Sequence, residues 1–108
     1  MNNVSIIGRL GQHPELRTTT NDKTVVSFSL AIENRFKDEP DWVPVEVWGK
    51  TAEVVAEHKS KGDQVAIVGR LTTSKWTTDD GENRSRIVVT AETIDFLHNA
   101  NQREEATV

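Results

Sequence analysis

Three tryptophans carry most of the binding chemistry available to this chain of 108 residues, namely Trp42, Trp48 and Trp76. In the segment 41–48 every second residue is a valine, so an extended strand would point the valines to one face and Trp42 and Trp48 to the other. If the valine face packs inward, the two indoles stand among polar groups, where they need a partner. A ligand with flat rings could provide one. The alternative is that the indoles cover a second small core or a subunit interface.

Basic side chains accompany the aromatic positions. Lys50 follows Trp48 closely and Arg35 precedes the tryptophan segment, and a flat aromatic pair beside such charges suits stacked bases and phosphates. The whole chain is acidic, with 13 Lys and Arg against 17 Asp and Glu and a formal net charge of −4, so we expect a modest local basic track. The basic residues on or next to the aromatic segments are Lys50, Lys59, Lys61, Arg70, Lys75, Arg84 and Arg86.

Side chains suited to catalysis or metal binding are sparse. The chain has no cysteine, and His13, His58 and His98 are isolated, so no pair has the spacing of metal ligands. Neither a glycine-rich phosphate loop nor a nucleophile elbow occurs in the sequence. We therefore expect a binding protein that is not an enzyme and uses no metal and no cofactor.

Length and hydropathy set the class of protein. The chain is long enough for one domain, expected at residues 1–98, and the segment 99–108 has no apolar pattern, which predicts a flexible C-terminal tail. The first ten residues lack a basic leader, and no stretch approaches membrane-spanning length. These features predict a cytoplasmic protein with no membrane partner, and an organellar or phage-encoded form is also compatible with them.

The apolar pattern has a period of mostly two, which predicts an all-β domain. Val4–Leu10 is the expected first strand, with a bulge at Gly8. A second strand is expected at about 24–34, and the third is the segment 41–48. Phe36 lies between these two strands. By strand parity it either plugs the edge of the core or, if the chain bends at the end of the second strand, is exposed for stacking.

One short helix interrupts the strands. Thr51 is the expected N-cap and Gly62 the expected C-terminal stop. The fourth strand then continues as far as Trp76, and its alternation without a bulge turns this indole away from the core. A hairpin turn is expected at 80–81, followed by a fifth strand at 87–97.

Five strands with one helix between the third and the fourth is the order of the OB-fold, a five-stranded Greek-key barrel that binds oligonucleotides and oligosaccharides. The chain resembles the bacterial-type, homotetrameric single-stranded DNA-binding proteins from about residue 3 to residue 97. Five strings in the order and spacing of that family carry the resemblance, at 8–17, 47–57, 61–65, 69–71 and 75–77.

The resemblance implies that base-stacking aromatics occupy Trp42, Trp48, Trp76 and Phe36. Together with the charge pattern it predicts phosphate contacts from Lys50, Lys75, Arg35, Lys61, Arg70, Arg84, Arg86 and Arg9. It also implies a homotetramer. The first strand supports self-association, because it is apolar on both faces and has no proline to protect its edge, and the expected interface residues are Val4, Ile6 and Ile7.

The expected function is sequence-independent binding and protection of single-stranded DNA during replication, recombination and repair. The alternative is another OB-fold binding module, such as a primosome accessory protein or a carbohydrate or protein-docking domain. The segment 35–41 is short for the family, which predicts a reduced binding footprint. Family members usually continue into a long tail with an acidic-hydrophobic tip that recruits replication and repair proteins. Such partners are expected only if a tail of this kind exists beyond this chain.

Overall fold

The computed structural model describes residues 1–98, and the expected tail at 99–108 lies outside the described residues. Within residues 1–98 all strands belong to one six-stranded sheet, and a single helix interrupts their order along the chain. The elements are β1 (Val4–Leu10), β2 (Glu15–Thr18), β3 (Thr24–Ile32), β4 (Asp41–Trp48), α1 (Lys50–His58), β5 (Gln64–Thr77) and β6 (Asn83–His98).

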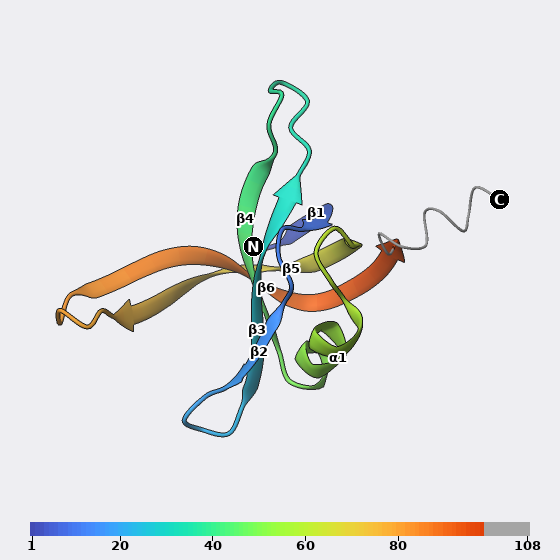
Figure 1. Cartoon of the computed structure of the whole chain (residues 1–108). Helices are drawn as coiled ribbons and strands as arrows, with labels where there is room; N and C mark the ends of the chain where they lie inside the picture. The colour runs from blue at the N-terminus through green and yellow to red at the C-terminus, as the bar shows by residue number, and fades with distance from the viewer. Residues whose placement is uncertain (99–108) are drawn as a thin grey trace.

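The sheet closes on itself. Its order is β1-β5-β6-β4-β3-β2, and β1 also pairs with β3, so that β1, β5, β6, β4 and β3 form a ring (Figure 1). β4 and β6 pair in parallel, whereas the other neighbours are antiparallel. This is the predicted five-stranded Greek-key barrel of the OB-fold, with α1 between the third and fourth strands of the ring, and the predicted fold class is confirmed.

Alternating valines supply much of the core. On β4, Val45 and Val47 are buried, while Trp42 and Trp48 on the opposite face are exposed. The helix packs against β3 and adds Val55 to the same cluster. Burying a side chain of this size contributes roughly 1.5–3 kcal/mol relative to leaving it in water, so the inward residues fix the barrel. Further members of the core are Leu10, Val26, Phe28, Leu30, Val65, Ile67 and Val89.

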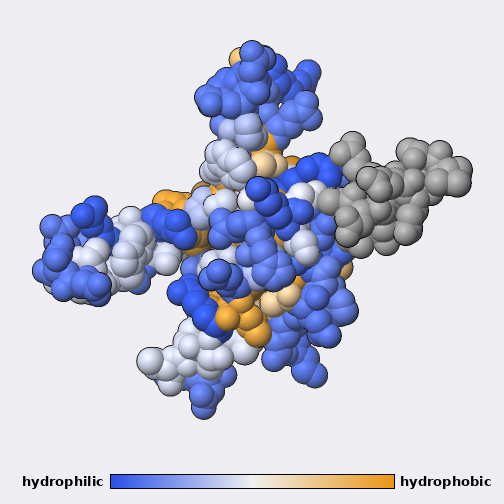
Figure 2. Space-filling model, viewed as in Figure 1, coloured by the Kyte–Doolittle hydropathy of each residue, from blue (hydrophilic) through white to orange (hydrophobic). Residues whose placement is uncertain are grey.

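Three arms project from the barrel, formed by the β2–β3 turn, the β3–β4 connection and the β5–β6 hairpin (Figure 1). Their outer ends are mostly hydrophilic, whereas hydrophobic residues show where the β5–β6 hairpin joins the barrel (Figure 2). The predicted turn of that hairpin is present, with Gly81 at φ 84. Within residues 1–98 no helix is long and apolar enough to span a membrane.

The start of the chain differs from the prediction in two places. The pattern did not predict β2, because all four of its side chains are exposed and Leu16 is its one apolar residue; it forms by pairing along its length with β3. The bulge expected at Gly8 is not found, since β1 keeps a continuous register with β5 through this residue. Gly8 provides space instead, because a Cβ there would lie 2.5 Å from the carbonyl oxygen of Ala31.

The irregularities of the sheet lie in the β5–β6 pairing. β6 carries one extra residue at Glu92 and another at Leu97, so the alternation along β5 is unbroken. β6 also begins earlier than predicted, at Asn83, because its polar first residues pair with β5 almost to the turn.

The helix begins earlier than predicted. Its N-cap is Gly49 and not Thr51, and Gly49 has a φ of 76, which glycine adopts at little cost. This conformation turns the chain sharply from β4 into α1, and the Ala52 N–H donates to the Gly49 carbonyl oxygen at 3.0 Å. The helix ends at His58, and Gly62 lies in the turn that follows rather than at the helix terminus.

Candidate nucleic-acid interface

A groove of about 890 Å³ lies on the outer face of the barrel, between the β2–β3 turn and the strands β5 and β6. Trp48, the last residue of β4, contributes to its wall and is 40% exposed. Lys23 and Arg70 bring positive charge to the groove. Hydroxyl groups line it at Thr19, Thr72, Thr73 and Thr90. Glu46 and Glu92 line it as well, so the groove combines a flat ring, charges of both signs and hydrogen-bonding groups.

A second hollow of about 490 Å³ adjoins Trp48 and is lined by Lys23 and Lys50 among other residues. The Gly49 N–H donates to the Thr24 carbonyl oxygen at 2.9 Å, which fixes the end of β4 against the β2–β3 turn. Trp48 thus stands between two hollows with lysines beside it. Lys50 was predicted here from its spacing. Lys23 was missed, because the folding of a polar turn onto β4 brings it to Trp48 and no pattern of apolar residues signals that contact.

Trp76 lies on the β5–β6 hairpin and is 45% exposed, on the side of β5 that the unbroken alternation predicts. Arg84 is its partner across the hairpin, and the Arg86 guanidinium carbon lies 6.0 Å from the centre of the indole. A hollow of about 360 Å³ is lined by Trp76, Arg84 and also Lys75. The structure therefore brings three of the predicted phosphate-binding residues to this tryptophan.

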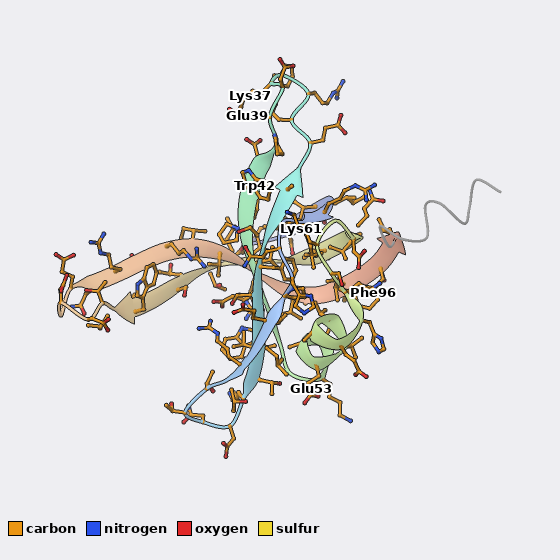
Figure 3. The ribbon with its side chains drawn as sticks, viewed as in Figure 1. Lys37, Glu39, Trp42, Glu53, Lys61 and Phe96 are labelled. Carbon is orange, nitrogen blue, oxygen red and sulfur yellow. The ribbon has the colours of Figure 1, made fainter. Side chains whose placement is uncertain are left out.

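Trp42 stands near the start of β4, at the base of the β3–β4 arm, and is 58% exposed (Figure 3). Its register partner on β3 is Ala31. The three indoles are thus all exposed, so the alternative that they cover a second core is wrong for residues 1–98.

Phe36 is 93% exposed because the chain leaves β3 at Ile32 and bends. Asn34 holds the bend: its Oδ1 accepts from the Phe36 N–H at 2.9 Å, and its Nδ2 donates to Asp41 at 2.8 Å. Lys37 Nζ donates to the same carboxylate at 3.2 Å. These two hydrogen bonds hold the pKa of Asp41 below its ordinary value. Phe36 is therefore not a plug at the edge of the core.

Two of the arginines near the tryptophans are paired with carboxylates, which reduces the local positive charge. Arg70 Nη1 lies 3.7 Å from Glu92 Oε1, and Arg84 Nη2 lies 2.7 Å from Glu82 Oε2. Both pairs are exposed, so each is worth roughly 0–1 kcal/mol and can open toward a phosphate. Glu92 was missed from the sequence because it is the extra residue of a β-bulge, which no local pattern marked.

Three of the predicted phosphate-binding residues lie away from these hollows. Arg9 is half-buried, and its Nη1 donates to the Gly62 carbonyl oxygen at 2.9 Å, which ties β1 to the turn after α1. Lys61 belongs to that same turn (Figure 3). Arg35 is exposed on the β3–β4 arm. The structure gives Arg9 a role in the fold and groups none of the three with Trp48 or Trp76.

The predicted interface residues of β1 do not share one direction. Val4 and Ile6 are half-buried and pack against the barrel core, whereas Ile7 is 54% exposed. β1 pairs with β5 along most of its length but with β3 only at Arg9 and Leu10. Within residues 1–98, the other edge of β1 from Val4 to Gly8 therefore has no partner strand.

Acidic and histidine side chains do not gather into a metal site. Across residues 1–98, no group of three or more His, Asp and Glu side chains is arranged to hold a metal ion.

Comparison with known proteins places the chain in a family. Residues 1–97 match the model of the Single-strand binding protein family. Single-stranded DNA-binding protein 3 of Clostridium acetobutylicum is 42% identical over 102 residues, which cover 90% of this chain and 71% of that protein. Single-stranded DNA-binding protein 1 of a Synechocystis species is 35% identical over 112 residues, covering 100% of this chain and 93% of that protein. The exposed indoles, the barrel and these matches lead to one conclusion, that the chain belongs to the single-strand binding protein family.

Proposed function

We propose that this chain binds single-stranded DNA without sequence preference and protects it during replication, recombination and repair. The observation that carries the proposal is the pairing of exposed indoles with positive charge, at Trp48 beside Lys23 and Lys50 and at Trp76 beside Arg84 and Arg86. Every base has a flat face, so stacking on an indole at roughly 1–3 kcal/mol per base gives affinity without a base code. Phosphate contacts add affinity by counterion release.

The placement of the arms supports the same function. In OB-fold proteins the loops between the first and second strands and between the fourth and fifth strands flank the binding face. Here the β2–β3 turn and the β5–β6 hairpin occupy those places (Figure 1). The groove at Trp48 is lined by residues of that turn and of β5 and β6. Duplex DNA hides its base faces within the stack, so this mode of binding prefers single strands. It requires no bond to be made or broken, and we propose no enzymatic activity.

We further propose a homotetramer. The unpaired edge of β1 can pair with the same edge of a second copy, and Ile7 lies exposed beside it. Assembly would bring several copies of the Trp42, Trp48 and Trp76 surface onto one strand of DNA, so that weak sites gain affinity through effective concentration. We also propose that residues 1–98 form an OB-fold domain that binds single-stranded DNA and that the protein acts in the cytoplasm, at the nucleoid.

Titration of intrinsic fluorescence tests the proposed function. The three tryptophans emit without interference because the chain has no tyrosine, and a base stacked on an indole quenches its emission. Unstructured oligothymidine should quench the emission to saturation, whereas duplex DNA of equal length should change it little. If single strands leave the emission unchanged while a polysaccharide alters it, a carbohydrate-binding OB-fold is the better assignment.

A further inference from the structure

Trp42 reaches across β3 to touch a glycine on the far side of that strand. A Cβ built on Gly11 would lie 2.3 Å from Cζ3 and 3.0 Å from Cη2 of Trp42, so the six-membered ring of the indole occupies the space that a side chain at position 11 would need. Gly11 itself is fixed to β3, because its N–H donates to the Ser29 carbonyl oxygen at 2.8 Å.

The residues between the Trp42 backbone on β4 and Gly11 have small side chains or none. Trp42 starts on β4 opposite Ala31, and Ser29 is the next residue of β3 on the same face. Gly11, beyond them, lies in the connection between β1 and β2, on the other side of β3 from β4. Gly11, Ser29 and Ala31 thus form a shallow seat under a ring that is still 58% exposed.

We infer that Gly11 is a positioning residue for single-strand binding, because the missing Cβ lets the Trp42 indole rest on this seat with its outer surface presented to a base. The inference depends on the proposed function. An unsupported indole would move among its side-chain rotamers, and ordering it on binding would cost affinity. The seat removes that cost before DNA arrives.

Gly11 differs from two other glycines of the barrel in the kind of atom that a side chain at its position would meet. A Cβ at Gly8 would meet the Ala31 carbonyl oxygen at 2.5 Å, and one at Gly69 would meet the Thr90 carbonyl oxygen at 2.1 Å, so both glycines make room for backbone. At Gly11 the nearest atoms belong to the far end of a side chain that can rotate away. Gly11 does not need glycine for its backbone conformation, because Gly49, Gly62 and Gly81 are the glycines with positive φ among the described residues. Alanine at position 11 should therefore move Trp42 and leave the fold intact.

The test is a double-mutant cycle with Gly11→Ala and Trp42→Ala, read by oligothymidine affinity, and Gln12→Ala in the same turn is the control. Gly11→Ala should weaken binding roughly two- to tenfold, the range expected for ordering one large side chain, and should have no further effect once Trp42 is alanine. In a Trp48→Phe, Trp76→Phe background, where Trp42 is the sole emitter, Gly11→Ala should also shift the emission and lower its anisotropy without DNA.

Three results would overturn the inference: an unchanged affinity, an unchanged Trp42 emission, or the same loss of affinity with and without Trp42. Ala31→Val is the second variant in case Gly11→Ala fails to fold, since a β-branched residue suits a strand and adds bulk to the same seat. It should show the same dependence on Trp42. Failure of the wild-type protein to bind oligothymidine would refute the proposed function itself, whereas the emission of Trp42 reports on the seat independently of DNA.

Discussion

At the scale of single residues, exposure separates binding aromatics from core aromatics. Trp42 and Trp76 are exposed, whereas Phe28 is buried in the barrel. Trp42→Ala and Trp76→Ala should each weaken binding by roughly 1–3 kcal/mol. Phe28→Ala should lower the stability of the fold by roughly 3–5 kcal/mol. Thermal melting beside fluorescence titration checks this contrast. A fall in melting temperature for either tryptophan variant as large as that for Phe28→Ala would show that the indoles serve the fold.

The acid beside Arg70 should limit affinity. Glu92 lies beside Arg70 in the groove and adds a negative charge where phosphate would bind. Glu92→Gln should tighten binding of oligothymidine by up to about fivefold, since an exposed pair is worth up to about 1 kcal/mol. The dependence of affinity on salt should also steepen, because Arg70 gains a phosphate contact. Glu57→Gln on α1 makes the same charge change away from the groove and should have no such effect.

The sequence predicts some of these residues well and others poorly, for physical reasons. Period-two alternation placed Trp42, Trp48 and Trp76 on the exposed face because one buried face fixes the direction of every side chain in a strand. Alternation fails beyond the end of a strand, so it could not decide the position of Phe36 on the arm. The position of Lys23 could not be predicted either, because its place beside Trp48 depends on how the β2–β3 turn folds onto β4.

At the scale of elements, close crossings of backbone should limit what the barrel tolerates. A Cβ at Gly69 would lie 2.1 Å from the Thr90 carbonyl oxygen on β6, and backbone of a central strand cannot move aside cheaply. Gly69→Ala should therefore lower the free energy of unfolding by roughly 1–3 kcal/mol or more. Ser85→Ala, at an exposed site on the same strand pair, is the control. Urea unfolding measures both variants, and equal midpoints would contradict the close crossing.

The β3–β4 arm should loosen in acid. Hydrogen bonds from Asn34 and Lys37 lower the pKa of Asp41, so the stabilisation they give is fully present above the ordinary aspartate pKa. It is lost as the pH falls through the lowered value in the folded protein. The amide signals of Phe36 and Lys37 should therefore move at that pH in an NMR titration. Asp41→Asn should remove the transition, and its persistence in this variant would assign it to another group.

Some strands and helix ends were predicted from the apolar pattern and others were not. Strands with several buried residues were predicted with nearly correct ends, because each inward side chain adds to the same signal. β2 was missed since backbone pairing with β3 holds it and burial does not. The start of α1 was misplaced because the positive φ of Gly49 makes the turn, whereas the prediction relied on a side-chain cap at Thr51.

At the scale of the whole molecule, the free edge of β1 predicts assembly. In light scattering at micromolar concentration the protein should have a mass well above the 12.1 kDa of one chain. Ile7→Lys should lower that mass, because it places a charge beside the proposed contact. Val54→Lys changes another exposed apolar residue, on α1, and should leave the assembly intact. A monomeric wild-type protein would refute the tetramer, and a fully assembled Ile7→Lys variant would exclude β1 as the contact.

The parallel pairing of β4 with β6 has a consequence for folding. It joins strands from opposite halves of the chain through Val45↔Val89 and Glu46↔Thr90, whereas β3–β4 and β5–β6 are hairpins of near neighbours in sequence. Local pairings form before distant ones because less chain entropy is lost, so this pairing should form after the two hairpins, as should the still more distant pairing of β1 with β5. Glu46 and Thr90 both line the groove. A molecule in which β4 and β6 are not yet paired could keep its hairpins and its helix yet have no groove, so the capacity to hold a DNA strand should appear only after the two hairpins have joined.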